Sequence, residues 1–158
     1  MIQGASKKFI IQVKKGQSDF FELDQKGDKV VIRGNNYVNI ATGLNWYLKY
    51  YAGIHLSWNG MTAKLPESLP KVSTPVRKET NLSLRYDFNY CTYSYTMAFW
   101  DWERWEKEID WMALHGINLP LAAVGHECVW RNLLLRLGFS NSKSMILLPD
   151  QHSLPGGK

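Results

Sequence analysis

The chain is poor in cysteine and has no long apolar run. Its two cysteines, Cys91 and Cys128, are too few for a disulfide scaffold. A bridge between them would need both at the same end of adjacent strands, so two small buried thiols are the simpler interpretation. No stretch approaches the roughly 18 apolar residues of a membrane span, so no transmembrane helix is expected. The opening MIQGASKKF has no apolar segment of the signal-peptide kind, so none is predicted here.

The chain also lacks clustered charge and a metal motif. It is basic overall, with a net charge of +5, but the basic residues are scattered over strand ends and a linker. That scatter argues against a nucleic-acid-binding surface. The pair His126–Glu127 lacks the second histidine of the HExxH motif, because Trp130 stands in its place. No metal site is therefore predicted.

Apolar residues make up 45% of the chain, so disorder is not expected. The N-terminal part predicts a small α+β layer followed by a linker. A helix is expected over 37–51, because apolar residues recur there at helical spacing. Residues 64–80 contain three prolines and many polar groups, which is typical of an extended linker. The expected strands are 9–13, 20–23, 29–33 and 54–58.

The C-terminal part predicts a strand–helix–strand–helix series. The expected strands are 83–89 and 117–124, and the expected helices are 101–115 and 129–137. This is two of the eight steps of a (β/α) barrel, and a complete barrel needs about 200 residues or more. Trp102 and Ile109 are expected on the buried face of the first helix.

Polar groups follow both predicted strands. In such a unit, groups just beyond the carboxyl ends of the strands face the active-site mouth. Asn89 lies at the end of the first strand and Cys91 and Tyr95 follow it; an amide there could bind hydroxyls and an aromatic ring could present an apolar face. The alternative is that they only satisfy backbone groups of the loop. Glu127 follows the second strand and could be a base, or a hydrogen-bonding group behind the pocket.

One family is recognisable in these segments. The run NYCTYSYTMAFWDWERWEKEIDWMALHGINLPLA resembles the start of the catalytic barrel of the α-N-acetylglucosaminidases, which are retaining glycoside hydrolases. The upstream GDKVVIRGNNYVNIATGLNWYLKYYAGIHLSWNG resembles the N-terminal domain of the same family. The resemblance implies an α/β fold, with an α+β accessory domain and Pro-rich linker at 1–80 and the first βα units of a TIM barrel at 81–140.

The resemblance also implies a function. It implies hydrolysis of terminal α-linked N-acetylglucosamine from heparan-type or mucin-type glycans, with no cofactor and no metal. By that resemblance Asn89 and Cys91 contact the terminal sugar and Tyr95 helps to wall its site. Both catalytic carboxylates are placed on later barrel strands, so no catalytic residue is expected in this chain and Glu127 is expected to support the pocket. The family implies an exported, periplasmic or lysosomal protein.

The chain departs from the family pattern at its end. The family usually has Gln at position 126 and Ala at position 128, and the resemblance is expected to stop after Ser140. The tail NSKSMILLPDQHSLPGGK has neither a helical nor an alternating pattern. One choice of codons for 147–158 encodes IAGPAFLAWWK, a family-like run, in another frame. We interpret 141–158 as an out-of-frame tail, and a naturally divergent tail is the alternative. A non-catalytic carbohydrate-binding or structural module, or a non-functional fragment, are the rival functional interpretations.

Overall fold

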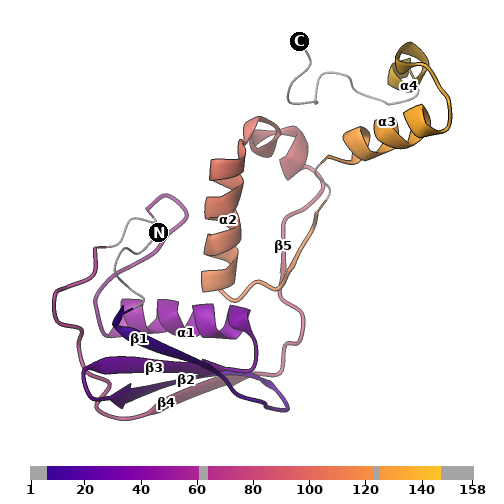
Figure 1. Cartoon of the computed structure of the whole chain (residues 1–158). Helices are drawn as coiled ribbons and strands as arrows, with labels where there is room; N and C mark the ends of the chain where they lie inside the picture. Colours follow the sequence, from indigo (N-terminus) through magenta and orange to yellow (C-terminus); the bar gives the residue numbers. More distant parts are fainter. Residues whose placement is uncertain (1–6, 61–63, 123–124, 147–158) are drawn as a thin grey trace. The chain divides into compact units, whose positions relative to one another are not determined.

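The computed structural model describes residues 7–60, 64–122 and 125–146 (Figure 1). The chain divides into two compact units, each built from two stretches of sequence. The first unit is Met1–Asp87 with Glu103–Leu119, and the second is Phe88–Trp102 with Pro120–Lys158. Helix α2 (Trp102–Leu114) therefore belongs almost entirely to the unit that contains the N-terminal layer.

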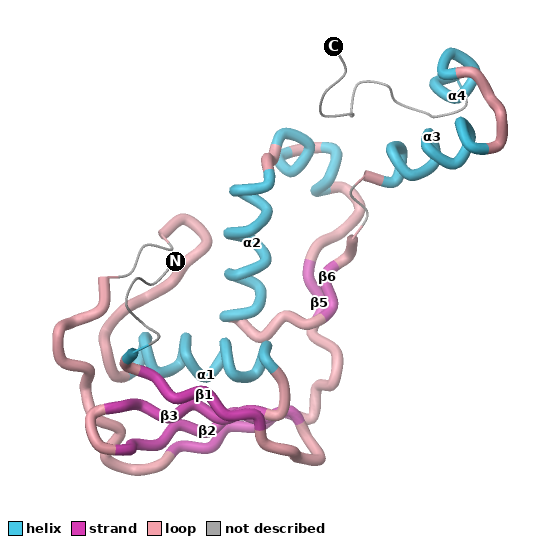
Figure 2. Tube along the Cα trace, in the orientation of Figure 1, coloured by secondary structure: helices cyan, strands magenta, loops and turns pink. Residues whose placement is uncertain are grey.

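The N-terminal layer is a four-stranded sheet in the order β1-β3-β2-β4, labelled in Figure 1 and coloured as strands in Figure 2. β1 and β3 are parallel, and β2 is antiparallel to both β3 and β4. The tight β2–β3 hairpin turns at Gly27, whose φ of 59° suits glycine. The strands are β1 (Phe9–Val13), β2 (Asp19–Lys26), β3 (Lys29–Gly34) and β4 (Val76–Thr80).

The core lies between this sheet and helix α1 (Tyr37–Tyr50). Asn36 caps the helix by accepting a hydrogen bond from the backbone of Asn39 at 2.9 Å. Glycine at position 43 allows the helix to approach the sheet, because an added Cβ would lie 3.0 Å from Ile32. The fully buried side chains of this core include Leu23, Val30, Ile32, Tyr47 and Leu48.

Two expectations for this region are wrong. Residues 76–80 of the expected linker form the edge strand β4, which pairs with β2. The sequence of β4, VRKET, is charged, which is compatible with an edge strand whose side chains are largely exposed. Arg77 of this strand pairs with Glu22 of β2 at 2.7 Å. Residues 54–58 form no strand; Ser57 and Gly60 instead close a tight turn with two backbone hydrogen bonds. Turn propensity in Trp58-Asn59-Gly60 outweighs the apolar character of the preceding residues.

The strand–helix–strand series is confirmed, but its strands are short. β5 (Tyr86–Asp87) neighbours β6 (Leu119–Pro120), and α2 lies between them in sequence. The expected buried face of α2 is wrong in part, because Trp102 is 70% exposed and Ile109 is 47% exposed. The loop between β5 and α2 contains two 3-10 turns, η2 (Thr92–Ser94) and η3 (Thr96–Phe99).

Two helices end the described part of the chain. α3 (His126–Arg136) has no buried residue, and its apolar side chains Val129 and Trp130 are exposed. α4 (Asn141–Ile146) forms where no regular pattern was expected, and it brings the buried Ser144 hydroxyl to the carbonyl of Asn141 at 2.8 Å. Within the described residues, no helix is long and apolar enough to cross a membrane.

Candidate functional site

The loop after β5 is organised by a polar cap. Phe88, directly after the strand, has a φ of 73°, a left-handed conformation that bulky residues rarely adopt. The side-chain oxygen of Asn89 then accepts hydrogen bonds from the backbone N–H groups of Cys91 at 2.9 Å and Thr92 at 3.3 Å. The Thr92 hydroxyl donates to the Asn89 carbonyl at 2.8 Å. Asn89 thus starts the first 3-10 turn, and a strained residue at a strand end is a feature that clusters at functional sites.

A tyrosine joins this loop to the residue that follows β6. The Tyr93 hydroxyl donates a hydrogen bond to the carbonyl of Leu121. The Tyr93 ring packs edge-on against Phe88, with 6.1 Å between ring centroids. The loop after β5 and the chain after β6, at 120–122, are therefore held together within the second unit.

The three residues predicted to bind sugar lie on this one loop. Asn89, Cys91 and Tyr95 are all exposed, and Tyr95 is 71% exposed. The side-chain oxygen of Asn89 accepts hydrogen bonds from the loop backbone, which agrees with the alternative that these residues satisfy backbone groups. The amide nitrogen of Asn89 has no hydrogen-bond partner among the described residues. That N–H₂ group, the Cys91 thiol and the Tyr95 ring are therefore available to a ligand.

Glu127 lies in the first turn of α3 and is half-buried. The helix begins directly after Gly125, whose φ is 79°. A carboxylate in the first turn is favoured by the positive end of the helix, which explains Glu127 without a catalytic role. Its side chain makes no hydrogen bond within the described ranges, so its support of the pocket stays a prediction.

The two cysteines form no disulfide bond with each other. Cys91 and Cys128 are both free, as the simpler interpretation held, but they are exposed rather than buried. In the part of the chain that the structure describes, no three His, Cys, Asp or Glu side chains gather in a way that could hold a metal ion.

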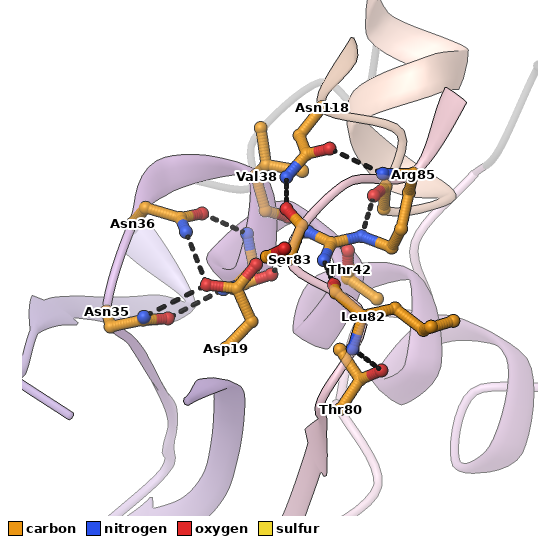
Figure 3. A network of polar contacts seen from close by, with 12 residues as sticks. Asp19, Asn35, Asn36, Val38, Thr42, Thr80, Leu82, Ser83, Arg85 and Asn118 are labelled. Carbon is orange, nitrogen blue, oxygen red and sulfur yellow. Dashed lines mark hydrogen bonds and ion pairs between the residues drawn. The ribbon is translucent and has the colours of Figure 1, made fainter. Parts of the chain in front are cut away.

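Sequence reasoning missed Arg85, which centres a polar network in the first unit (Figure 3). Its guanidinium pairs with Asp19 of β2 at 2.8 Å and donates to the carbonyls of Leu82, at 2.6 Å, and Gly116. Burial alone would raise the pKa of Asp19, but hydrogen bonds from Asn35 and Arg85 outweigh it and lower that pKa. No local pattern around Arg85 indicates this role, because two of its partners, Asp19 and Gly116, are 66 and 31 residues away in sequence.

A second polar cluster that sequence reasoning missed is centred on Glu108 of α2. This carboxylate is only 2% exposed. It accepts a hydrogen bond from the indole Nε1 of Trp58 at 2.7 Å and pairs with Arg104 at 2.9 Å. The spacing offered a signal, because Arg104 precedes Glu108 by one helical turn. Glu103 precedes Lys107 by the same interval and forms an exposed ion pair with it.

The α+β layer and the strand–helix–strand series that follows it agree with the fold expected from the sequence, and comparison with known proteins supports the same class. Residues 1–71 match the Alpha-N-acetylglucosaminidase (NAGLU) N-terminal domain, and residues 85–148 match the Alpha-N-acetylglucosaminidase (NAGLU) tim-barrel domain. The chain is thus the N-terminal domain and the beginning of the TIM barrel of a glycoside hydrolase. The barrel match continues past Ser140, where the resemblance was expected to stop.

Individual relatives agree with this class. Human α-N-acetylglucosaminidase is 44% identical over 115 residues, which is 73% of this chain. A family 89 glycoside hydrolase from Clostridium perfringens, solved with 2-acetamido-1,2-dideoxynojirmycin, is 41% identical with a TM-score of 0.80 over 87% of the chain. The same bacterial enzyme, with two glutamates replaced and GlcNAc-alpha-1,4-galactose bound as its substrate, gives 40% and 0.79 over the same share.

The chain belongs to the α-N-acetylglucosaminidase family of glycoside hydrolases. It spans 16% of the length of each of these relatives. The family and the fold expected from the sequence are therefore confirmed.

Proposed function

We propose that this chain supplies part of the sugar-binding site of an exo-acting α-N-acetylglucosaminidase. The observation that carries the proposal is the exposed loop after β5, which presents Asn89, Cys91 and Tyr95 together. Its ligand is terminal α-linked N-acetylglucosamine on a heparan-type or mucin-type glycan. The relatives solved with N-acetylglucosamine-like ligands support this class of ligand. Family membership also supports an exported, periplasmic or lysosomal location.

Each residue has a role that its chemistry allows. The Asn89 amide nitrogen donates to a sugar hydroxyl or to the acetamido carbonyl, while its oxygen keeps the loop in shape. The Tyr95 ring offers an apolar face to the pyranose ring, and the exposed Cys91, whose backbone N–H is held by Asn89, offers its thiol to the sugar. Retaining hydrolysis also needs two carboxyl groups about 5–5.5 Å apart, and we propose that later barrel strands provide them.

A chimera tests this proposal. Residues 7–146 replace the corresponding segment of the Clostridium perfringens enzyme, and hydrolysis of an aryl α-N-acetylglucosaminide is measured. Asn89→Ala in the chimera should lower kcat/KM by roughly tenfold to a hundredfold, because a donor in a polar pocket is lost. Lys71→Ala, far from the loop in sequence, should leave kcat/KM unchanged. Full activity in both variants would show that the pocket residues are wrongly assigned.

An assay of the 158-residue chain alone distinguishes sugar binding from catalysis. We expect no turnover of the aryl α-N-acetylglucosaminide above the buffer background, because the bond must be protonated and attacked by a pair of carboxyl groups. Turnover that Glu127→Gln abolishes would place a catalytic group in this chain and contradict the proposal. Absence of both turnover and N-acetylglucosamine binding would favour a structural module.

A further inference from the structure

A cavity of about 310 Å³ lies at one end of the N-terminal sheet. It is bounded by the start of β1, the β2–β3 hairpin and residues 67–71. This volume lies at the lower end of the range of small-molecule sites, about 300–1,000 Å³. All its lining residues belong to the first unit, and none of them lies on the loop after β5. The cavity therefore shares no residue with the proposed sugar site.

Side-chain hydrogen bonds hold the cavity walls together. The Lys8 ammonium donates to the carbonyls of Pro66 at 2.6 Å and Glu67 at 2.8 Å, which joins the residue before β1 to the segment after residue 64. The Gln25 side chain accepts from the backbone of Val72 at 3.0 Å and donates to the carbonyl of Gly27 at 2.8 Å. Three separate segments are thus fixed around the cavity before any ligand binds.

The charge of the lining is unbalanced. Four lysines and two carboxylates line the cavity, a net charge of +2. Lys7, Lys29 and Lys71 make no ion pair or side-chain hydrogen bond to any described residue, whereas Lys14 and Lys107 each pair with a glutamate. Like charges gathered in a concave surface raise the local concentration of ions of the opposite sign.

We propose that this cavity binds a small molecule in which an anionic phosphate or sulfate group is attached to a hydroxylated body. Lysine ammonium groups are common ligands of phosphate, which they contact as point charges. The Asp28 and Glu67 carboxylates accept hydrogen bonds from hydroxyl groups and repel a second anionic group. The site consequently favours a compact ester with one anionic group over a long polyanion.

Titration of the whole 158-residue chain tests this assignment. Inorganic phosphate, inorganic sulfate, glucose 6-phosphate and heparin are compared at constant ionic strength by calorimetry and by amide shifts in NMR spectra. Glucose 6-phosphate should bind with a Kd on the order of 0.1–1 mM, and inorganic phosphate and sulfate about tenfold more weakly. Tighter binding of heparin than of glucose 6-phosphate would overturn the proposal.

Variants locate the site. Lys29→Gln and Lys71→Gln should each weaken binding of glucose 6-phosphate by about threefold to tenfold, because each removes one ammonium group. Lys15→Gln, at an exposed lysine outside the cavity, is the matched control and should bind like the wild type. Asp28→Asn should weaken glucose 6-phosphate more than inorganic phosphate. Equal binding by the two cavity variants and the control would overturn the assignment, and circular dichroism confirms that each variant is folded.

Discussion

Asp19 and Arg85 form an ion pair that is mostly buried, since only 17% and 16% of their side chains are exposed. Asp19 also accepts hydrogen bonds from the side chains of Asn35 at 3.1 Å and Asn36 at 3.2 Å. Its carboxylate thus joins β2, the cap of α1 and the residue before β5. Replacing it should leave the Asn35, Asn36 and Arg85 donors without this acceptor.

The pH dependence of stability follows from this pair. The pKa of Asp19 is lower in the folded protein than in the unfolded chain, so the unfolded state binds more protons at acid pH. Its contribution to stability is therefore present above the unfolded pKa of about 3.9 and is lost as the pH falls through the lower folded pKa. Urea unfolding between pH 7 and pH 3 should show stability falling with acid.

The variant Asp19→Asn measures how much of the pH dependence of stability comes from Asp19. It should cost about 1–3 kcal/mol at pH 7, because the buried charge of Arg85 loses its partner. It should also reduce the loss of stability below about pH 4. Glu22 and Asp24, whose pKa values are lowered as well, will keep part of the acid dependence. An acid dependence identical to that of the wild type would show that Asp19 is not a source of it.

At the scale of elements, Glu108 joins α2 to the turn that contains Trp58. Glu108→Ala removes the carboxylate that pairs with Arg104 and accepts the hydrogen bond of the Trp58 indole N–H. We expect a loss of about 1–3 kcal/mol in the free energy of unfolding, because the charged hydrogen bonds of Glu108 are lost while the Arg104 side chain, 30% exposed, stays accessible to water.

Glu103→Ala is the matched control, because Glu103 forms an exposed pair with Lys107 on the same helix. Its loss should cost no more than about 0.5 kcal/mol. Urea unfolding at pH 7 measures both variants. Equal losses would mean that the buried position of Glu108 has no energetic consequence.

The two units should differ in local stability, a property of the whole molecule. The buried apolar side chains are concentrated in β2, β3 and α1, whereas α3 buries none. Opening free energies follow the amount of buried apolar contact, so amides of the first unit should exchange slowly and those of α3 quickly. Hydrogen exchange followed by mass spectrometry checks this. Equal, strong protection in both units of a monomer would contradict it.

Periodic and turn-forming segments were predictable from the sequence. The strands β1 and β3 and the helix α1 agree with prediction within one residue, because their signals are local: β-branched runs, glycine turns and helical spacing. The strand–helix–strand series was predictable for the same reason. Asn89, Cys91 and Tyr95 were recognisable as residues of one loop, because they lie within seven consecutive positions at the end of an expected strand.

Only the tertiary structure decided which distant residues pair with one another. β4 is a strand because its backbone pairs with β2, more than 50 residues earlier, and its charged sequence carries no sign of that pairing. Glu108 is buried because Trp58, 50 residues away, reaches its carboxylate. Local sequence fixes which residues favour a helix, a strand or a turn, since those preferences act over a few residues. Which polar groups are desolvated and paired depends on contacts that form only when the whole chain has folded.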